Sequence, residues 1–526
     1  MRPSCHRSSP SSTTLAVCPY HRPVIHPASE RSASASPAAT SEGSAVAGAA
    51  RLEPLPEVAA TRPIDVAEAF RGLPGLALLE SARPGRNARW TYLTADPVAV
   101  LAEPAVGRDP FAVARSLVAR LDGGQPAGTA AAPDAPPFLG GLVGYLAYEL
   151  GDSIERLPPP PADDQGLPLL RLALHDWVIA WDRRTGRAWL AGRALDGDQR
   201  RLARRLAEVR GRLRRPIQAG RGTAGADPDL AFDFISSLDR RAYEAGVEAV
   251  RGWIARGDLY QANLTRRLTT SFDDDPWPLY RRLRTGDPSL FSAYLDLGEG
   301  APGHGSALGS APARPRAILS ASPEPFLAVS ATGVVSADPI KGTRPRGRTR
   351  DDDRALACEL LASAKDRAEN VMIVDVLRND LGRVSVPGTV RVPRLCRLER
   401  TAAVQHLVST VTGRLAPGRD AFDLLRASFP GGSITGAPKI RAMELLRELE
   451  PTRRGPYTGA LGWIGPDGAM ATSILIRTFV ADGTRLSLHV GGGITWQSDP
   501  AAEWDETVAK ARGPLGAIGG REVGSE

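Results

Sequence analysis

Predicted strands and helices follow one another in this chain without the regular strand–helix repeat that a doubly wound parallel sheet requires. Leu76–Ser81 and Trp90–Leu93 predict two partner strands, and Phe111–Leu121 has the spacing of a helix. Residues 170–194 predict two strands around the turn Asp182–Gly186. The order favours an α+β fold with large, mainly antiparallel sheets.

The rest of the chain continues this mixture. Phe138–Tyr148 is apolar and punctuated by glycines, which suits close backbone packing in a sheet. Charged or periodic segments predict helices over Asp196–Leu213 and Asp239–Gly257, and Asp258–Leu268 alternates as a strand. Asp351–Gly382 is expected to be one long helical stretch.

Composition narrows the class of protein. The chain has 526 residues, of which 42% are hydrophobic and 24% charged, as is ordinary for a globular protein. No apolar run approaches the roughly 18 residues of a membrane span. The net charge of +7 is spread along the chain, aromatic residues make up 6%, and no nucleic-acid motif occurs. We therefore expect neither a membrane nor a nucleic-acid partner.

The cysteines indicate a reducing compartment. Cys5, Cys18, Cys358 and Cys396 form no CxxC pair and no disulfide framework, so a cytoplasmic protein with free thiols is expected. None lies in a Gly-x-Cys-x-Gly turn, so no cysteine has the setting of an amidase nucleophile.

Changes in composition predict five segments. Residues 1–50 are rich in Ser, Ala and Pro and are expected to be disordered. Residues 51–214 form an N-terminal region, and the Gly/Ala/Pro-rich stretch 215–231 is the predicted linker. Residues 232–518 are the predicted catalytic domain, and 519–526 a C-terminal tail.

Lys341 lies between an apolar run and the Gly/Pro/Arg loop that ends at Gly347. Nearby cations lower the pKa of a lysine and so favour its nucleophilic form, but such a run is more often a basic surface loop. Residues 342–349 also come close to the phosphate-binding GxxxxGK[ST] pattern. Arg348 in place of its lysine, and Pro345, which lacks a backbone N–H, oppose a nucleotide site.

Two acidic pairs recur at helical spacing. Asp366 and Glu369 share one predicted helix face, as do Glu503 and Glu506, with Lys510 one turn further on. Carboxylates from two helices suit Mg²⁺, which binds few protein carboxylates and keeps room for water and substrate. A solvated helix face is the alternative for each pair taken alone.

Pro430–Lys439 is a glycine-rich loop that leads into a predicted helix, and Pro438 is expected at the first position of that helix. The free amides at such a helix start can bind an anion. The alternative is an ordinary junction between a loop and a helix. Single residues that suit anion binding follow it: Tyr457, Arg477, Gly491, Gly492 and Gly493. His406 lies in a strand-like run and fits a core histidine as well as a polar wall.

Taken together, these stretches resemble the chorismate-utilising enzymes, which include the anthranilate, aminodeoxychorismate, isochorismate and salicylate synthases. The resemblance runs from Tyr243 to Leu515, and the N-terminal LLES and GGLVGYLAYE segments extend it. The motifs are SPEPF, PIKGTRPRG, KDRAEN, MIVDVLRNDLGRV, QHLVSTVTG, GGSITGAPK, ILIRTF and GGGITW. The resemblance implies their fold, with large antiparallel sheets sandwiched and flanked by helices.

Two residues make the chain similar to the aminodeoxychorismate synthases within this family. Lys341 stands where anthranilate synthases usually carry alanine, and Gln261 stands where isochorismate and salicylate synthases carry a lysine base. The resemblance therefore implies conversion of chorismate and ammonia to 4-amino-4-deoxychorismate for para-aminobenzoate and folate synthesis. Anthranilate synthase is the alternative, and a nucleotide-binding protein without enzyme activity is a remote one.

The resemblance also implies roles for residues. Lys341 would attack C2 of the ring, Glu324 would protonate the leaving C4 hydroxyl, and His406 would border the ring. Mg²⁺ would be held by Glu369 and Glu506, with Glu503 and Asp366 as further or alternate ligands. Substrate contacts would come from Gly342, Thr343, Thr435, Gly436, Tyr457, Arg477, Gly491, Gly492, Gly493 and Lys510.

The resemblance also carries expectations about the source of ammonia and about a tryptophan pocket. Since the chain lacks an amidase cysteine turn, a separate glutamine amidotransferase subunit is implied, which would form a heterodimer with it. Leu79, Glu80 and Ser81 resemble the segment that binds tryptophan in anthranilate synthases, so a tryptophan pocket is expected there or, equally, an ordinary core strand.

Overall fold

The computed structural model describes residues 50–83, 85, 88–103, 109–124, 134–214, 231–300, 314–401 and 404–524. Nearly all of the expected disordered extension (1–50) and of the expected linker (215–231) lies outside these residues, as do Cys5 and Cys18. The described residues belong to one compact unit, Ala45–Glu526.

The larger sheet of the described part has 13 strands, all paired antiparallel except β23 with β9. Its order is β1 (Arg51–Pro54), β8 (Arg187–Gly192), β7 (Trp177–Asp182), β3 (Trp90–Thr94), β2 (Ala77–Glu80), β11 (Phe291–Gly300), β12 (Arg314–Ser322), β21 (Thr478–Ala481), β22 (Arg485–Ile494), β10 (Gln261–Ser271), β9 (Phe232–Ser236) and β23 (Gly520–Val523), with β18 (Gly436–Ala437) beside β10.

The second sheet has 10 described strands, all antiparallel. Its order is β15 (Ile340–Pro345), β17 (Val404–Arg414), β14 (Val334–Ala337), β13 (Pro325–Val329), β20 (Met470–Ile474), β19 (Ala460–Ile464), β5 (Gly141–Leu146), β6 (Leu170–His175) and β4 (Ala99–Ala102), with β16 (Arg391–Arg400) beside β17.

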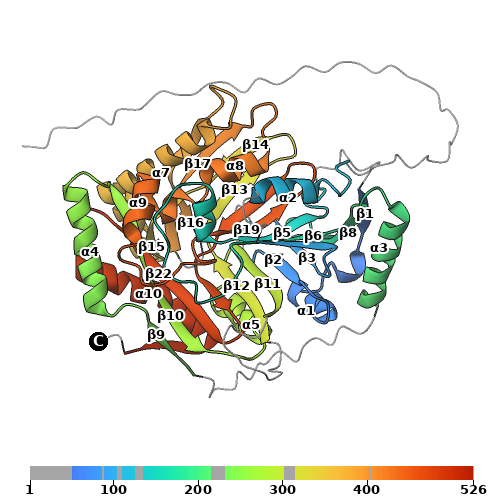
Figure 1. Cartoon of the computed structure of the whole chain (residues 1–526), viewed down its shortest axis with the longest axis horizontal. Coiled ribbons are helices and arrows are strands. Elements are labelled where there is room, and N and C mark those ends of the chain that lie inside the picture. The colour runs from blue at the N-terminus through green and yellow to red at the C-terminus, as the bar shows by residue number, and fades with distance from the viewer. Residues whose placement is uncertain are drawn as a thin grey trace, which may run out of the picture. The chain divides into compact units, whose positions relative to one another are not determined.

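The two sheets pack face to face and helices cover their outer faces (Figure 1). Side chains from both sheets meet in the middle layer, where Phe138 stacks on Trp463 with ring centroids 4.9 Å apart and Tyr92 meets both edge-on. The α-helices of the described part are α1 (Pro63–Ala67), α2 (Pro110–Val118), α3 (Gln199–Leu213), α4 (Arg240–Ala255), α5 (Trp277–Gly286), α6 (Arg350–Ala362), α7 (Ala364–Gly382), α8 (Ala421–Ser428), α9 (Lys439–Leu446) and α10 (Pro500–Ile518). The expected α+β sandwich is confirmed.

The strands of the N-terminal region and of the expected catalytic domain share both sheets. β2 pairs with β11 in the larger sheet, and β5 pairs with β19 in the second. Both regions therefore contribute to one sandwich, and the boundaries proposed between them stay predictions.

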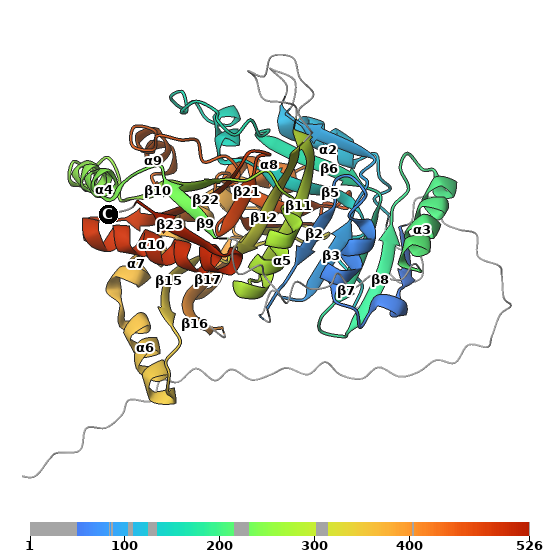
Figure 2. The same cartoon turned by 90° about the horizontal axis from the view of Figure 1, so that it is seen from below.

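Two local expectations were wrong. Residues 170–194 form three strands, because the chain leaves the second sheet after β6 and enters the larger one at β7, with only Asp176 between them. The helical stretch Asp351–Gly382 is broken at Ser363, whose extended backbone ends α6 and whose hydroxyl accepts a hydrogen bond from the amide of Asp366 to cap α7. α6 lies beside β15 at the edge of the second sheet (Figure 2).

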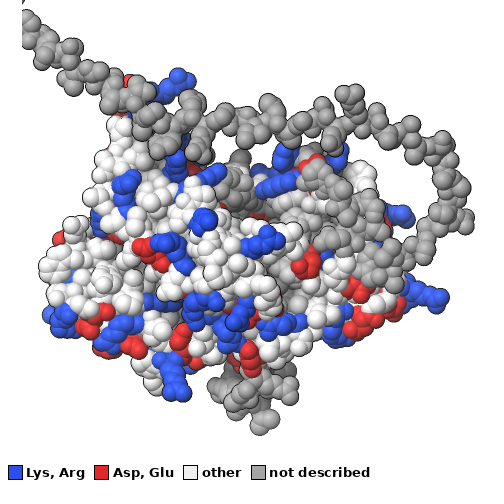
Figure 3. Space-filling model, turned by 90° about the horizontal axis from the view of Figure 1, so that it is seen from above, with Lys and Arg blue, Asp and Glu red and all other residues white. Residues whose placement is uncertain are grey.

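Charge and hydropathy agree with an ordinary protein surface. Basic and acidic side chains are interspersed over the face shown in Figure 3. Within the described ranges, no helix combines the length and the apolar character needed to cross a membrane.

Glycines in the centre of the second sheet permit close contact between neighbouring backbones, as the sequence of Phe138–Tyr148 predicted. A Cβ at Gly144 would lie 1.9 Å from the carbonyl oxygen of Arg171. We expect Gly144→Ala to lower the free energy of unfolding by roughly 1–3 kcal/mol, because neighbouring backbone must move to accept the methyl group. Urea unfolding followed by circular dichroism measures the change.

Gly211→Ala is the matched control, since no atom lies within 4 Å of the added Cβ and the site is within α3. Alanine is favoured over glycine in a helix by about 1 kcal/mol, so this variant should be at least as stable as the parent. Equal unfolding midpoints for Gly144→Ala and the parent would contradict the packing argument.

Candidate active site

A cavity of about 620 Å³ lies where β22 of the larger sheet faces β15 of the second sheet, with α7 and α10 beside it. Its volume falls within the range of small-molecule sites. The predicted residues that line it are Glu324, Lys341, Gly342, Thr343, Asp366, Glu369, His406, Tyr457, Arg477, Gly491, Gly493, Glu503, Glu506 and Lys510. The cavity is thus lined by segments that lie far apart in the sequence.

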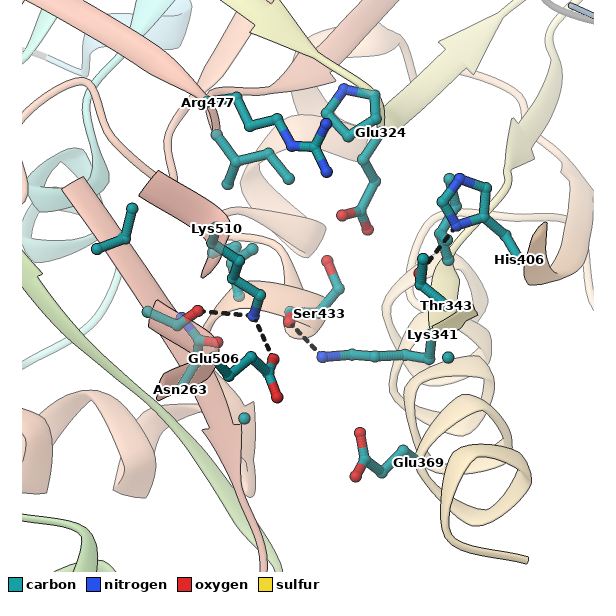
Figure 4. A pocket seen from close by; sticks show the side chains of 18 of the residues that line it. Asn263, Glu324, Lys341, Thr343, Glu369, His406, Ser433, Arg477, Glu506 and Lys510 are labelled. Carbon is teal, nitrogen blue, oxygen red and sulfur yellow. Dashed lines mark hydrogen bonds and ion pairs between the residues drawn. The ribbon is translucent and has the colours of Figure 1, made fainter. Parts of the chain in front are cut away.

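Lys341 points into this cavity from β15 (Figure 4). Its amine donates a hydrogen bond to the backbone carbonyl of Ser433 at 3.0 Å. Glu324 follows β12, is 8% exposed and lies in the same cavity. Burial raises the pKa of Glu324, and the charge of Lys341 only partly opposes the shift. The cavity therefore brings an amine together with a buried carboxyl group whose pKa is raised.

Carboxylates of the chain itself neutralise the arginines of the basic loop. Arg344 pairs with Glu359 at 2.8 Å and with Asp366 at 3.2 Å, and Arg346 forms a bidentate pair with Asp353. The amide of Gly347 donates to Asp353 at 3.0 Å. In a phosphate-binding loop the amide would face the ligand. These internal contacts therefore oppose the nucleotide-binding alternative for this segment.

Gly342 occupies a conformation that its neighbours require. Its φ is +81°, and a Cβ there would lie 2.9 Å from the side chain of Asp366. Any other residue would be strained and would push α7 away from β15.

His406 and Arg477 line the cavity from separate strands or strand ends. The hydroxyl of Thr343 lies 2.9 Å from Nδ1 of His406, as the register of β15 and β17 requires. Burial, together with the positive charges of Arg83 and Arg477, lowers the pKa of His406 to about 4, so its imidazole is neutral near pH 7. Arg477 is held in a left-handed conformation (φ +50°), and its guanidinium lies 3.6 Å from Asp287.

The two acidic pairs come from α7 and α10. Burial raises the pKa of Glu369, and the charge of Glu503 adds to the increase. Burial also raises the pKa of Glu503, which accepts a hydrogen bond from Ser498 at 2.6 Å. Burial acts in the same direction on Glu506, but its ion pair with Lys510 at 2.6 Å lowers the pKa below the ordinary value. The pKa values of Glu369 and Glu503 are therefore raised mainly by burial, with smaller contributions from neighbouring carboxylates.

This donor set fits Mg²⁺ if one carboxylate from each helix holds it. The described ranges contain no cluster of three or more His, Cys, Asp or Glu side chains that could hold a metal ion. Mg²⁺ uses one or two protein carboxylates and completes its shell with water and substrate oxygens. Glu369 and Glu506 both point into the cavity, where one carboxylate from each helix could hold a cation (Figure 4). The metal and its ligands stay a prediction.

Three predicted substrate contacts do not line the cavity. Thr435, Gly436 and Gly492 are not among its lining residues. Thr435 is fully buried and donates its hydroxyl to the carbonyl of Gly431, while Gly436 pairs with Ala262 in the sheet. Pro438 is the N-cap of α9 and not its first residue. In this region the lining residues are Ser433 and Ile434.

The fully buried side chain of Arg454 joins the segments below the cavity. It pairs with Glu450 through two hydrogen bonds of 2.7 and 2.8 Å, and donates to the carbonyls of Ile434 at 3.0 Å and Asn263 at 2.7 Å. Glu450 also accepts hydrogen bonds from the amide and hydroxyl of Thr265. One ion pair thus connects β10, the turn that carries Ser433 and the segment that leads to Tyr457.

Sequence reasoning assigned no role to several lining residues: Asn263, Lys365, Ser433 and His489. Asn263 shares a strand face with Gln261, and Lys365 precedes Asp366, so both lay next to positions already noted. Gln261 is 1% exposed, and its amide nitrogen lies 2.3 Å from where a Cβ on Gly493 would be. The amine of Lys341 lies 3.7 Å from the same point.

A second cavity of about 170 Å³ is lined by Leu79, Glu80 and Ser81, together with Trp463 and residues of β11. The carboxylate of Glu80 is engaged by the hydroxyl of Tyr280 at 2.8 Å and by Arg284 at 2.6 Å. The segment is therefore a strand that borders a cavity, and tryptophan binding there stays a prediction.

Comparison with known proteins places this site in a family. The family of chorismate binding enzymes matches residues 78–516. The anthranilate synthase component 1 of Streptomyces coelicolor is 41% identical over 84% of this chain and 83% of its own length. The aminodeoxychorismate synthase component 1 of Salmonella typhimurium is 42% identical over 72% of this chain and 76% of its own length.

The solved structures agree with the sequences. Anthranilate synthase component I of Streptococcus pneumoniae has a TM-score of 0.69 and 30% identity over 82% of this chain and 93% of that one. The chain therefore belongs to the chorismate binding enzymes.

Proposed function

We propose that this protein is the chorismate-binding component of an aminodeoxychorismate synthase, which converts chorismate and ammonia to 4-amino-4-deoxychorismate and water. The observation that carries the proposal is the amine of Lys341 in the cavity, beside a buried Glu324. An anthranilate synthase has no need of a nucleophile at this position.

The chain's own residues would perform two displacements. Once deprotonated, the amine of Lys341 attacks C2 of the ring, the double bond shifts, and the C4 hydroxyl leaves with a proton from Glu324. Ammonia then adds at C4, the double bond returns, and the bond between C2 and Lys341 breaks. The raised pKa of Glu324 supports its role as the acid, because more of the carboxyl group is protonated near neutral pH.

Cationic and hydrogen-bonding groups in the cavity support binding of a dianion such as chorismate. Glu369 and Glu506 would hold Mg²⁺, with Glu503 and Asp366 nearby. The bound metal would neutralise and orient a ring carboxylate. Arg477, Tyr457 and Lys510 offer a guanidinium, a phenol and an ammonium to the second carboxylate. The neutral imidazole of His406 borders the cavity without adding charge.

Ammonia would come from a separate glutamine amidotransferase subunit in the cytoplasm. The names of the relatives, component 1 of a synthase, support a second component. Neither described cysteine suits glutamine hydrolysis, because Cys358 is exposed on α6 and Cys396 is buried in β16. The product would serve para-aminobenzoate and folate synthesis.

Anthranilate synthase is the second candidate, because the Streptomyces coelicolor relative of that name matches more of this chain than the aminodeoxychorismate synthase does. Incubation with chorismate, Mg²⁺ and ammonium followed by mass spectrometry separates the two. We expect 4-amino-4-deoxychorismate as the direct product. Anthranilate as the direct product would reject our proposal.

Lys341→Ala should abolish ammonium-dependent formation of 4-amino-4-deoxychorismate, because the covalent nucleophile is removed. Chorismate affinity measured by calorimetry and the circular dichroism spectrum should remain close to those of the parent. The control is Arg367→Ala, because Arg367 is exposed. Lys439→Ala is unsuitable, because Lys439 forms an ion pair with Asp380 at 2.8 Å. Full activity of Lys341→Ala would rule out the covalent adduct.

Glu324→Gln should lower kcat by about 10²–10⁴-fold, because an amide of the same shape cannot supply the acid proton. KM for chorismate should change little. Glu324→Asp retains a carboxyl group and should keep more activity than the amide variant. Initial rates with saturating ammonium test this, and a glutamine variant as active as the aspartate variant would contradict the acid role.

A further inference from the structure

His489 lines the larger cavity, although it belongs to none of the sequence motifs described above. It lies on β22, where Gly491 and Gly493 share its face of the strand and line the same cavity. Its side chain is nearly completely buried and stacks on Tyr457, with ring centroids 4.9 Å apart and planes inclined by 9°. The two rings come from segments that no local sequence pattern connects.

One hydrogen bond fixes the orientation of the imidazole. It donates to the backbone carbonyl of Arg453, four residues before Tyr457, and Nε2 has no partner among the described residues. Nδ1 therefore carries the proton. Burial, together with the charges of Arg267 and Arg454, lowers the pKa of His489 well below its usual value, so the ring is neutral.

The backbone around Tyr457 is held independently of its ring. The amide of Tyr457 donates to the carbonyl of Arg454 at 3.2 Å, and the amide of Thr458 donates to Leu475 at 2.7 Å. Thr458 takes the left-handed conformation (φ +59°), and its hydroxyl donates to the carbonyl of Tyr457 at 2.6 Å. These contacts fix where the side chain starts, whereas the plane of the phenol ring is set by what packs on its face.

We propose that His489 is a positioning residue of the chorismate site, which holds the ring of Tyr457 so that its phenol hydroxyl is presented to the substrate. The hydrogen bond to Arg453 ties the imidazole to the segment that carries Tyr457, and the parallel stack passes that orientation to the phenol. The inference rests on the proposed function only in taking chorismate as the ligand of the cavity.

A double-mutant cycle tests the inference. His489→Ala, Tyr457→Phe and the double variant are prepared in the full chain, and chorismate binding is measured by calorimetry with Mg²⁺, alongside kcat and KM. Aromatic pairs contribute enough that His489→Ala should raise Kd and KM for chorismate about 2- to 12-fold, with kcat little changed. In the Tyr457→Phe background, the same substitution should add no further loss, since the hydroxyl is already absent.

His489→Phe keeps an aromatic ring on the stack and should recover most of the affinity. His175→Ala is the matched control: it removes another buried, neutral imidazole whose Nε2 also lacks a partner in the described ranges, but it lies in β6 and outside the cavity lining. It should lower the melting temperature without changing KM.

The inference is overturned if His489→Ala leaves Kd and KM unchanged, if its effect is the same in both Tyr457 backgrounds, or if His489→Phe is no better than His489→Ala. Failure of the proposed function gives a different result. In that case the parent protein forms another product, while its chorismate affinity still reports on the stack.

Discussion

The geometry of the larger cavity depends on the buried ion pair between Arg454 and Glu450. Its hydrogen bonds reach the carbonyls of Asn263 and Ile434, so a strand and a turn are fixed to the segment that carries Tyr457. Removal of one member of a buried pair leaves an uncompensated charge, which typically costs roughly 3–5 kcal/mol. Lys341 donates to the carbonyl of Ser433, next to Ile434, so the position of its amine is linked to this buried ion pair.

The charged side chains near the cavity fall into two groups: one forms ion pairs within the protein, and the other lines the cavity. The arginines of the basic loop are largely paired with Glu359, Asp353 and Asp366, and so stabilise the contact between β15, α6 and α7. The lysines and Arg477 face the cavity, where they meet the carboxylates of α7 and α10. A dianionic substrate with a divalent cation would complete the balance between these groups.

The sequence allowed the fold class, both partner strands near the N-terminus and most lining residues to be predicted, because strand periodicity and motif residues are local signals. The break at Ser363 was missed because one serine cap overrides the helical pattern on both sides of it. Ser433 and His489 were missed because their roles come from a carbonyl and a ring face that other segments meet in three dimensions. Thr435 and Gly436 were placed at the cavity by their motif, whereas the hydrogen bonds of β18 turn them toward the sheet.

The sharing of both sheets between the two ends of the chain has a consequence for folding kinetics. Leu142 pairs with Ile464, and Leu79 pairs with Ala293, so neither region completes its sheets until distant segments have been synthesised and brought together. Non-local antiparallel pairing of this kind raises contact order, and high contact order slows folding. During synthesis on the ribosome, the early strands β2 and β5 therefore wait with open edges for partners that emerge much later, and such edges favour aggregation unless they are protected.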